Sequence, residues 1–229
     1  MSDNIILLRH YIFIDPNDIF CNINENNILI EIQKKHTQNY TNGEIIKYYG
    51  YKDIVNLLEK YDDTLCKLFL ELNCNYPALL ADIGRLVILY TYGGIYHDLK
   101  CMSTKKMIDY LKPVSNDIEL IGEEHPTPKF SYKVRNGNIV ALHKNSNFIK
   151  SVLKKITKDL QQNKNAFGRT KVFEIGSGNY INSFLNNTNQ NIYIYPFINE
   201  RMLIFDREIY SKNGKKWQNT EEFLFKNHK

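Results

Sequence analysis

The sequence predicts one α/β domain, with a mixed, mainly parallel sheet and helices on both of its faces. Two observations support this prediction. Short apolar runs with the length of strands alternate along the chain with segments of helical spacing, the pattern that places parallel strands between helices. The 229 residues, 43% of them hydrophobic, suffice to bury one core, and no internal repeat or Pro/Gly/Ser-rich linker divides them. We therefore expect residues 1–229 to form a single domain.

The first half of the chain contains three expected strands and three expected helices. The strands are short apolar runs at residues 5–8, 28–32 and 45–49. The helices carry apolar residues three or four positions apart, at 54–61, at 65–72 and in a longer segment that begins at Pro77. Proline is favoured at the first position of a helix. Gly93-Gly94 should end this helix, because glycine adopts the left-handed conformation that closes helices.

The second half adds strands, one antiparallel hairpin and a lysine-rich helix. The expected strands lie at residues 95–99, 118–121, 130–134, 139–142, 192–197 and 202–205. Asn136-Gly137 separates two of them and is the strongest short signal for a hairpin turn. Ser146 or Asn147 could cap a helix at 148–160. We interpret its four lysines as a solvated face rather than a binding patch: Lys150, Lys154, Lys155 and Lys158.

The charge balance is basic, with a net charge of +5 and a pI of about 8.8. Such a balance fits an anionic partner, namely nucleic acid, a membrane surface or a nucleotide phosphate, and equally fits a lysine-rich solvated surface. No expected helix combines a basic stripe with interleaved aromatic residues, and no zinc-finger or RNA-binding signature is present. A nucleic-acid-binding domain is therefore only a third hypothesis, and we expect no nucleic-acid partner.

The sequence carries no sign of export or membrane insertion. The first residues place an acidic side chain before a short apolar run that Arg9 interrupts, unlike a signal peptide. No apolar run is long enough to span a bilayer. The four cysteines lack the CxxC spacing of zinc or redox sites, so we expect reduced, structural thiols. These features predict a soluble cytoplasmic protein.

A candidate site lies around the Gly-Gly turn. Asp82 and Arg85 stand at i and i+3, so they share one face of the expected helix. On the strand that follows, alternation at period 2 would place Tyr96, Asp98 and Lys100 on one face. Ligands of open α/β sheets bind beyond the carboxyl ends of strands, where Asp98 lies. The spacing alone equally fits a surface ion pair and an aspartate in an ordinary turn.

The stretch ALLADIGRLVILYTYGGIYHDL, residues 78–99, resembles a known signature. It is similar to the centre of retaining sugar transferases with the DXD motif and a GT-A fold, which are the glycosyltransferase 32-like enzymes and the large clostridial glucosylating toxins. Their pattern is an A/S-D-x-x-R helix followed by L-Y-x-x-G-G-I-Y-x-D-x-D. Nine residues fall in register with it: Asp82, Arg85, Leu89, Tyr90, Gly93, Gly94, Ile95, Tyr96 and Asp98.

A weaker likeness extends beyond this signature. Residues 46–63 resemble the upstream strand and helix of the family, and residues 138–156 and 173–185 resemble its downstream strand–helix and glycine-loop segments. Together the likeness spans residues 28–217. The N-terminal tryptophan motif of the family is absent.

The resemblance implies a glycosyltransferase that moves a sugar from a UDP- or GDP-sugar to a glycan or protein acceptor. By position, Asp82 and Arg85 would hold hydroxyls of the donor sugar, and Tyr96 would line the same pocket. Asp98 would contact the ribose and, where one is present, the metal. The alternative is a catalytically inactive protein of the same fold that still binds a nucleotide sugar.

One residue of the signature departs from the family, because the second aspartate of DXD is Lys100 here. A late family segment, E-N-x-S-x-W, adds Glu and Ser to the metal shell of the toxins. With Asn213 and Trp217 in register, lysines occupy those positions too, as Lys212 and Lys215. An ammonium cannot ligate a cation but binds phosphate well. We therefore expect lysines to replace the charge of Mn²⁺ or Mg²⁺, with Asp98 as metal ligand only if an ion is retained.

The resulting expected site has two overlapping groups. Asp98, Lys100 and Arg85 would act in catalysis. The donor would contact Asp82, Arg85, Tyr96, Asp98, Lys100, Asn213, Lys215 and Trp217.

Several further polar residues are weaker candidates. His97 should face away from Asp98, which favours a packing role. Glu123, Glu124 and His125 could hold an acceptor or a metal, although a polar loop explains them as well. By its place in the family, the segment 176–178 would shape the acceptor side, and Glu174 is an isolated candidate nearby.

Overall fold

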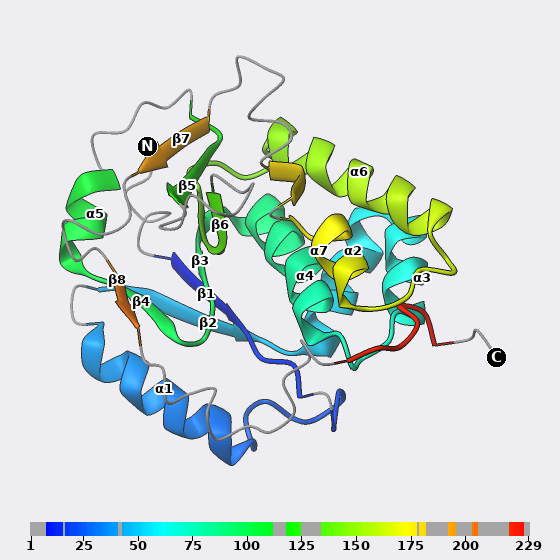
Figure 1. Ribbon diagram of the computed structural model, residues 1–229. Helices are drawn as coiled ribbons and strands as arrows, with labels where there is room; N and C mark the ends of the chain where they lie inside the picture. Colours follow the sequence, from blue (N-terminus) through cyan, green and yellow to red (C-terminus); the bar gives the residue numbers. More distant parts are fainter. Residues whose placement is uncertain are drawn as a thin grey trace.

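The computed structural model describes residues 8–15, 17–40, 43–111, 118–124, 134–177, 179–181, 192–195, 203–205 and 220–226 (Figure 1). The strands are β1 (Leu8–Ile12), β2 (Ile45–Tyr49), β3 (Gly94–His97), β4 (Cys101–Ser103), β5 (Leu120–Glu124), β6 (Val134–Ala141), β7 (Ile192–Tyr195) and β8 (Leu203–Phe205). The helices are α1 (Asn27–Asn39), α2 (Tyr51–Tyr61), α3 (Asp63–Glu71), α4 (Pro77–Tyr92), α5 (Lys105–Leu111), α6 (Asn147–Gln162) and α7 (Arg169–Ile175).

Six strands form the central sheet in the order β2-β1-β3-β6-β5-β7. The pairs β1–β2, β1–β3 and β5–β7 are parallel, whereas β6 runs antiparallel to both β3 and β5. Five of these strands therefore point the same way, and β6 alone is reversed. A separate antiparallel pair joins β4 to β8. The expected mixed, mainly parallel α/β sheet is confirmed.

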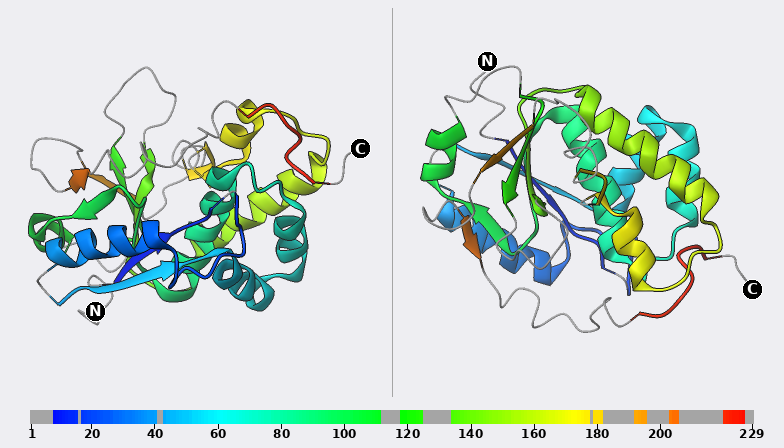
Figure 2. Two further views of the ribbon diagram at one scale, coloured as in Figure 1. Left: turned by 90° about the horizontal axis from the view of Figure 1, so that it is seen from below. Right: turned by 45° about the horizontal axis from the view of Figure 1, so that its top comes forward.

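Helices cover both faces of the sheet (Figure 2). Ile12, Tyr96 and Ile139 face the larger core, which α2, α3, α4 and α6 complete. The neighbouring residues Tyr11 and Ile95 face the opposite way, toward α1 and α5 respectively. This alternation is the period-2 pattern of a strand buried on both sides. No helix in the part of the chain that the structure describes is long and apolar enough to span a bilayer.

Most of the expected elements occur where the sequence predicts them. β2, α2, α3 and α4 match within three residues, with a proline at the start of α4. Ser146 caps α6, because its hydroxyl accepts a hydrogen bond from the backbone of Ile149, and the four lysines of this helix are exposed. β5, β7 and β8 overlap their predicted ranges. Of the strand expected at 5–8, only Leu8 lies within the described residues, where it begins β1.

The strand expected at 28–32 is wrong, because these residues belong to α1. Asn26 starts the helix, since its side chain accepts hydrogen bonds from the backbone N–H groups of Ile28 and Leu29. Leu29, Ile32 and His36 are the buried positions, and their spacing of three and four is that of one helix face. A five-residue apolar run was too short to reveal this period.

The hairpin turn expected at Asn136-Gly137 is also wrong, because both residues lie inside β6. An antiparallel pair does occur, between β5 and β6, but its register shifts at Gly122/Glu123. Gly122 pairs with Ile139 and Glu123 with Arg135, so three residues of β6 bulge from the ladder. The bulge turns toward β3, where the Gly137 carbonyl accepts a hydrogen bond of 2.8 Å from the Asp98 backbone.

His97 anchors the same bulge and is fully buried. Its Nδ1 lies 2.8 Å from the Asn138 side chain, while its Nε2 has no hydrogen-bond partner among the described residues. Burial, reinforced by the charge of Arg9, lowers the pKa of His97 to about 3. The ring is therefore neutral at physiological pH, and its position fits the packing role that the sequence predicts.

Two consecutive glycines join α4 to β3, with φ angles of 66° and 91°. A Cβ on Gly94 would lie 2.8 Å from the Leu8 carbonyl and 2.9 Å from Nε2 of His10. We expect Gly94→Ala to lower the free energy of unfolding by about 3 kcal/mol or more, because left-handed strain and a backbone collision add. Gly43 is the matched control, since its φ is 80° and nothing lies within 4 Å of its Cβ position.

Gly43→Ala should therefore cost about 1 kcal/mol, the strain alone. Urea unfolding of the two variants measures the difference. Equal losses would mean that the close approach at the start of β3 is not a constraint.

The buried neutral His97 predicts acid destabilisation. Below pH 6.5 the unfolded chain binds a proton on this ring that the folded chain does not, so the free energy of unfolding falls as pH falls. The loss should approach about 1.4 kcal/mol per pH unit down to a pH of about 3. His97→Gln should flatten the curve of unfolding free energy against pH by about one proton between pH 6 and 4. Parallel curves for the variant and the wild-type chain would contradict the assignment.

Candidate functional site

Asp82, Arg85, Tyr96 and Asp98 form one cluster, which we call the DRD cluster. On α4, one guanidinium nitrogen of Arg85 lies 2.9 Å from Asp82. The same nitrogen lies 3.8 Å from Asp98, which follows the carboxyl end of β3. The Tyr96 hydroxyl donates a hydrogen bond of 3.2 Å to Asp98, and the guanidinium sits 4.7 Å from the centre of the Tyr96 ring. The structure thus brings together four of the residues that the sequence predicts.

Burial differs across the cluster in a way that suits ligand binding. Asp82 and Arg85 are buried, with side chains 10% and 5% exposed, whereas the Asp98 side chain is 27% exposed. Arg85 is fixed further, because its Nε donates to the Ala81 carbonyl within α4. The cluster is therefore rigid at its base and open to solvent at Asp98.

Two carboxylates share a single guanidinium in this cluster. Burial raises the pKa of Asp82, and the nearby charge of Asp98 raises it further. Arg85 and two hydrogen bonds from Ser177 oppose this shift. The arrangement thus offers hydrogen-bond acceptors at its rim and a planar guanidinium behind them.

Two glycines from distant segments make room for the carboxylates. A Cβ on Gly137 of β6 would lie 2.6 Å from Oδ2 of Asp98. A Cβ on Gly176 would collide with Oδ2 of Asp82 and lie 2.9 Å from the Val172 carbonyl. Gly176 and Ser177 belong to the segment expected to shape the acceptor side, and both meet Asp82. The acceptor role of this segment stays a prediction. The sequence gives no sign that Gly137 belongs to the site, because an Asn-Gly pair favours a hairpin turn.

Lys100 does not continue the strand of Asp98. β3 ends at His97, and the Asp98 carbonyl accepts a hydrogen bond of 2.7 Å from the backbone of Cys101. Residues 98–101 therefore form a tight turn, and the expectation that alternation places Asp98 and Lys100 on one strand face is wrong. Lys100 is partly exposed in this turn, two residues after Asp98. Its role toward phosphate stays a prediction.

The remaining candidates stay predictions, and several of them fall outside the described residues. Glu174 is exposed on α7, where it pairs with Lys171. The backbones of Glu123 and Glu124 end β5, next to the reversed strand β6. Five residues fall outside the described part of the chain: His125, Lys212, Asn213, Lys215 and Trp217.

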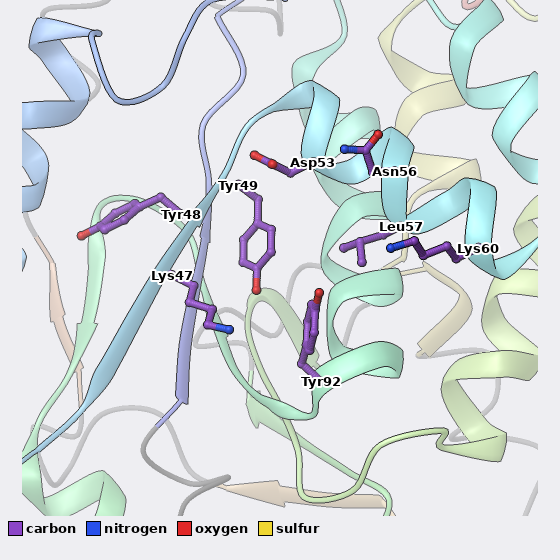
Figure 3. Close-up of a pocket in the computed structure, with 8 residues that line it drawn as sticks. All are labelled: Lys47, Tyr48, Tyr49, Asp53, Asn56, Leu57, Lys60 and Tyr92. Carbon is purple, nitrogen blue, oxygen red and sulfur yellow. The ribbon is translucent and has the colours of Figure 1, made fainter.

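A surface pocket of about 360 Å³ lies elsewhere, between the edge strand β2 and α2 (Figure 3). Lys47 and Tyr49 line it from β2, Lys60 from α2 and Tyr92 from the end of α4. The Lys47 ammonium sits 5.2 Å from the centre of the Tyr92 ring. None of its lining residues belongs to the DRD cluster, so this pocket is not the predicted site.

The side chains near Asp98 offer few ligands for a divalent ion. Residue 100 supplies an ammonium where the family supplies a carboxylate, and Asp82 is engaged by Arg85 and Ser177. Within the described ranges, no group of three His, Cys, Asp or Glu side chains could hold a metal ion. The donor set of these residues therefore does not match the all-oxygen shell that Mg²⁺ or Mn²⁺ prefers.

Comparisons with known proteins agree with the geometry. Residues 17–124, from before α1 to the end of β5, match the family described as the glycosyltransferase sugar-binding region containing the DXD motif. Among solved structures, the PaToxG glycosyltransferase aligns with a TM-score of 0.51 at 18% identity, covering 79% of this chain and 69% of that chain. No curated protein matches the sequence. The chain thus has a GT-A-like α/β fold, and the segment that carries Asp82, Arg85 and Asp98 is similar to the sugar-binding region of DXD glycosyltransferases.

Proposed function

We propose that the chain is a glycosyltransferase that moves a sugar from a UDP- or GDP-sugar to a glycan or protein acceptor. The observation that carries this proposal is the DRD cluster, in which four residues of the family signature converge at the carboxyl end of β3. Retention of the anomeric configuration follows from the family resemblance alone and stays a prediction. The catalytically inactive alternative shares every binding residue, so turnover of the bound donor is what separates the two.

The geometry supports donor binding at this edge of the sheet. β1 lies between β2 and β3, and all three strands are parallel. The chain runs from β1 to its neighbour β2 and later returns to β3 on the opposite side of β1. Ligands of open α/β sheets bind at such a change of direction, outside the carboxyl ends of the strands. Asp98 stands there with a partly exposed carboxylate, which could accept hydrogen bonds from the ribose or sugar hydroxyls. Arg85 lies behind it to hold the carboxylate in place.

We further propose that the donor binds without a divalent ion. A diphosphate is strongly negative, and a metal usually offsets that charge. In this chain, Lys100 replaces the carboxylate that would hold the ion, and its ammonium could contact the diphosphate directly as a point charge. Lys212 and Lys215, outside the described residues, would add to this charge if the late segment closes over the donor.

Donor binding is tested by isothermal titration calorimetry with UDP-glucose, UDP-N-acetylglucosamine and GDP-mannose. Asp98→Ala should weaken the best donor by at least about 1.5 kcal/mol, or more than tenfold in Kd, because a charge-assisted hydrogen bond is lost. Asp63→Ala is the control, since this exposed aspartate lies in α3, away from the cluster. An Asp98→Ala variant that binds as tightly as the control would refute the assignment of this edge as the donor site.

Metal independence is tested with the same donor. EDTA should change the wild-type Kd by less than twofold. Lys100→Ala should weaken binding threefold or more and reduce its dependence on salt, because a screened charge contact is removed. The control is Lys105→Ala, which changes an exposed lysine at the start of α5 and should alter neither the affinity nor its dependence on salt.

Lys100→Asp restores the family motif and should make binding respond to Mn²⁺. A tenfold gain from Mn²⁺ in the wild-type chain would show that lysine does not replace the ion.

A further inference from the structure

The turn that carries Asp98 is anchored by buried polar side chains from β1 and α1. Nε2 of His36 lies 2.9 Å from the Leu99 carbonyl, and the Tyr11 hydroxyl donates a hydrogen bond of 3.0 Å to the Cys101 carbonyl. Just beyond the turn, the Ser103 backbone donates to the Tyr40 hydroxyl at 3.1 Å. We call His36, Tyr11 and Tyr40 the α1 clamp, because two of the three belong to α1 or its C-cap.

The α1 clamp is internally connected and closed to water. The hydroxyls of Tyr11 and Tyr40 are hydrogen-bonded to each other, and the ring centres of Tyr11 and His36 are 4.2 Å apart. Nδ1 of His36 lies 2.8 Å from the hydroxyl of Tyr48 on β2. His36 and Tyr11 are fully buried, and Tyr40 is 8% exposed. A network in which every member is held by another is rigid, and that rigidity passes to the backbone that it binds.

The bonding pattern fixes which nitrogen of His36 carries the proton. A carbonyl only accepts hydrogen bonds, so Nε2 must donate to Leu99. In the neutral ring, Nδ1 then accepts from the Tyr48 hydroxyl. The Leu99 carbonyl therefore sets the tautomer, and the Tyr48 hydroxyl stabilises it by donating to Nδ1.

His10 makes the same pair of contacts at the other end of β3. Its Nε2 lies 2.8 Å from the Gly93 carbonyl, and its Nδ1 lies 3.0 Å from the Tyr49 hydroxyl. Tyr48 and Tyr49 are consecutive in β2, so they serve opposite faces of the sheet. The two histidines therefore differ in position rather than in chemistry: His10 holds the start of β3, and His36 holds the turn after its end.

We propose that His36 is a positioning residue for the donor site, acting with Tyr11 and Tyr40 through the α1 clamp. The inference rests on the proposed function and goes beyond it. The carbonyl groups of Leu99 and Cys101 both accept hydrogen bonds from the α1 clamp. The turn is thereby held with the Asp98 carboxylate beside Arg85 before a donor arrives. Such preorganisation strengthens binding by removing the entropy cost of ordering the turn.

The test compares His36→Leu with the matched variant His10→Leu. Each change removes one buried Nε2–H donor from a carbonyl and one partner from a tyrosine hydroxyl, so both should lower stability in urea to a similar extent. Only His36→Leu should raise the Kd of the best-binding nucleotide sugar, by fivefold or more, while His10→Leu stays within twofold. His36→Gln, whose amide can donate to Leu99, should return the Kd to within threefold of the wild-type value.

Hydrogen exchange in the absence of any donor gives an independent measurement. Peptides that cover residues 98–103 should exchange at least tenfold faster in His36→Leu than in His10→Leu. Unchanged exchange, or an equal loss of affinity in both variants, would overturn the inference.

If the wild-type chain binds no nucleotide sugar, the proposed function fails and the positioning role fails with it. The exchange rates would then still decide whether the α1 clamp holds the turn. Should His36→Leu not fold, Tyr11→Phe takes its place with the same expectations, because it removes only the hydroxyl that is bonded to Cys101 and Tyr40.

Discussion

The candidate site depends on the buried guanidinium of Arg85. A charge taken out of water costs several kcal/mol unless it is paired and hydrogen-bonded, so Arg85 requires its contact with Asp82. The same group also faces Asp98, which ties α4 to the end of β3 and sets the distance between helix and strand. The small residues follow from this constraint. Gly137 and Gly176 leave the space that the two carboxylates occupy, since a single methyl group at either position would collide with them.

The two layers of the molecule contribute different parts of this site. α4, on one face of the sheet, supplies the charges that can meet a ligand. α1, on the other face, and Tyr11 of β1, whose side chain points to that face, supply neutral hydrogen-bonding groups that hold the backbone of the turn. This division is physically sensible, because carbonyl groups in a turn need donors but gain nothing from an additional buried charge. Asp98 lies at the junction, with its carboxylate toward Arg85 and its backbone held by Gly137 and Cys101.

Local spacing predicted the part of the site that lies within one stretch of sequence. Asp82 and Arg85 share a helix face because they are three residues apart, and Asp98 follows the next strand after a glycine turn. Gly137 and Ser177 reach the same cluster from 39 and 79 residues beyond Asp98, which only the topology of the sheet arranges. The Asn-Gly pair shows the difference clearly. Its sequence favours a tight turn, yet tertiary packing uses the glycine for a close approach to a carboxylate.

The strand expected at residues 28–32 and the turn expected at Asn136-Gly137 were both inferred from a few neighbouring residues. In each case, contacts with residues distant in the sequence determine the structure. The run at residues 28–32 contains three isoleucines, whose β-branched side chains favour a strand over five positions. The helix emerges only when Asn26 is recognised as its cap and His36 as the last buried position of one face. A polar residue in an apolar face was the missing clue. His36 is buried not because it is hydrophobic but because the Leu99 carbonyl and the Tyr48 hydroxyl satisfy both of its nitrogens. His36 is polar, so it does not show in the hydrophobic pattern of the helix. The same residue makes the contact between α1 and the turn that carries Asp98.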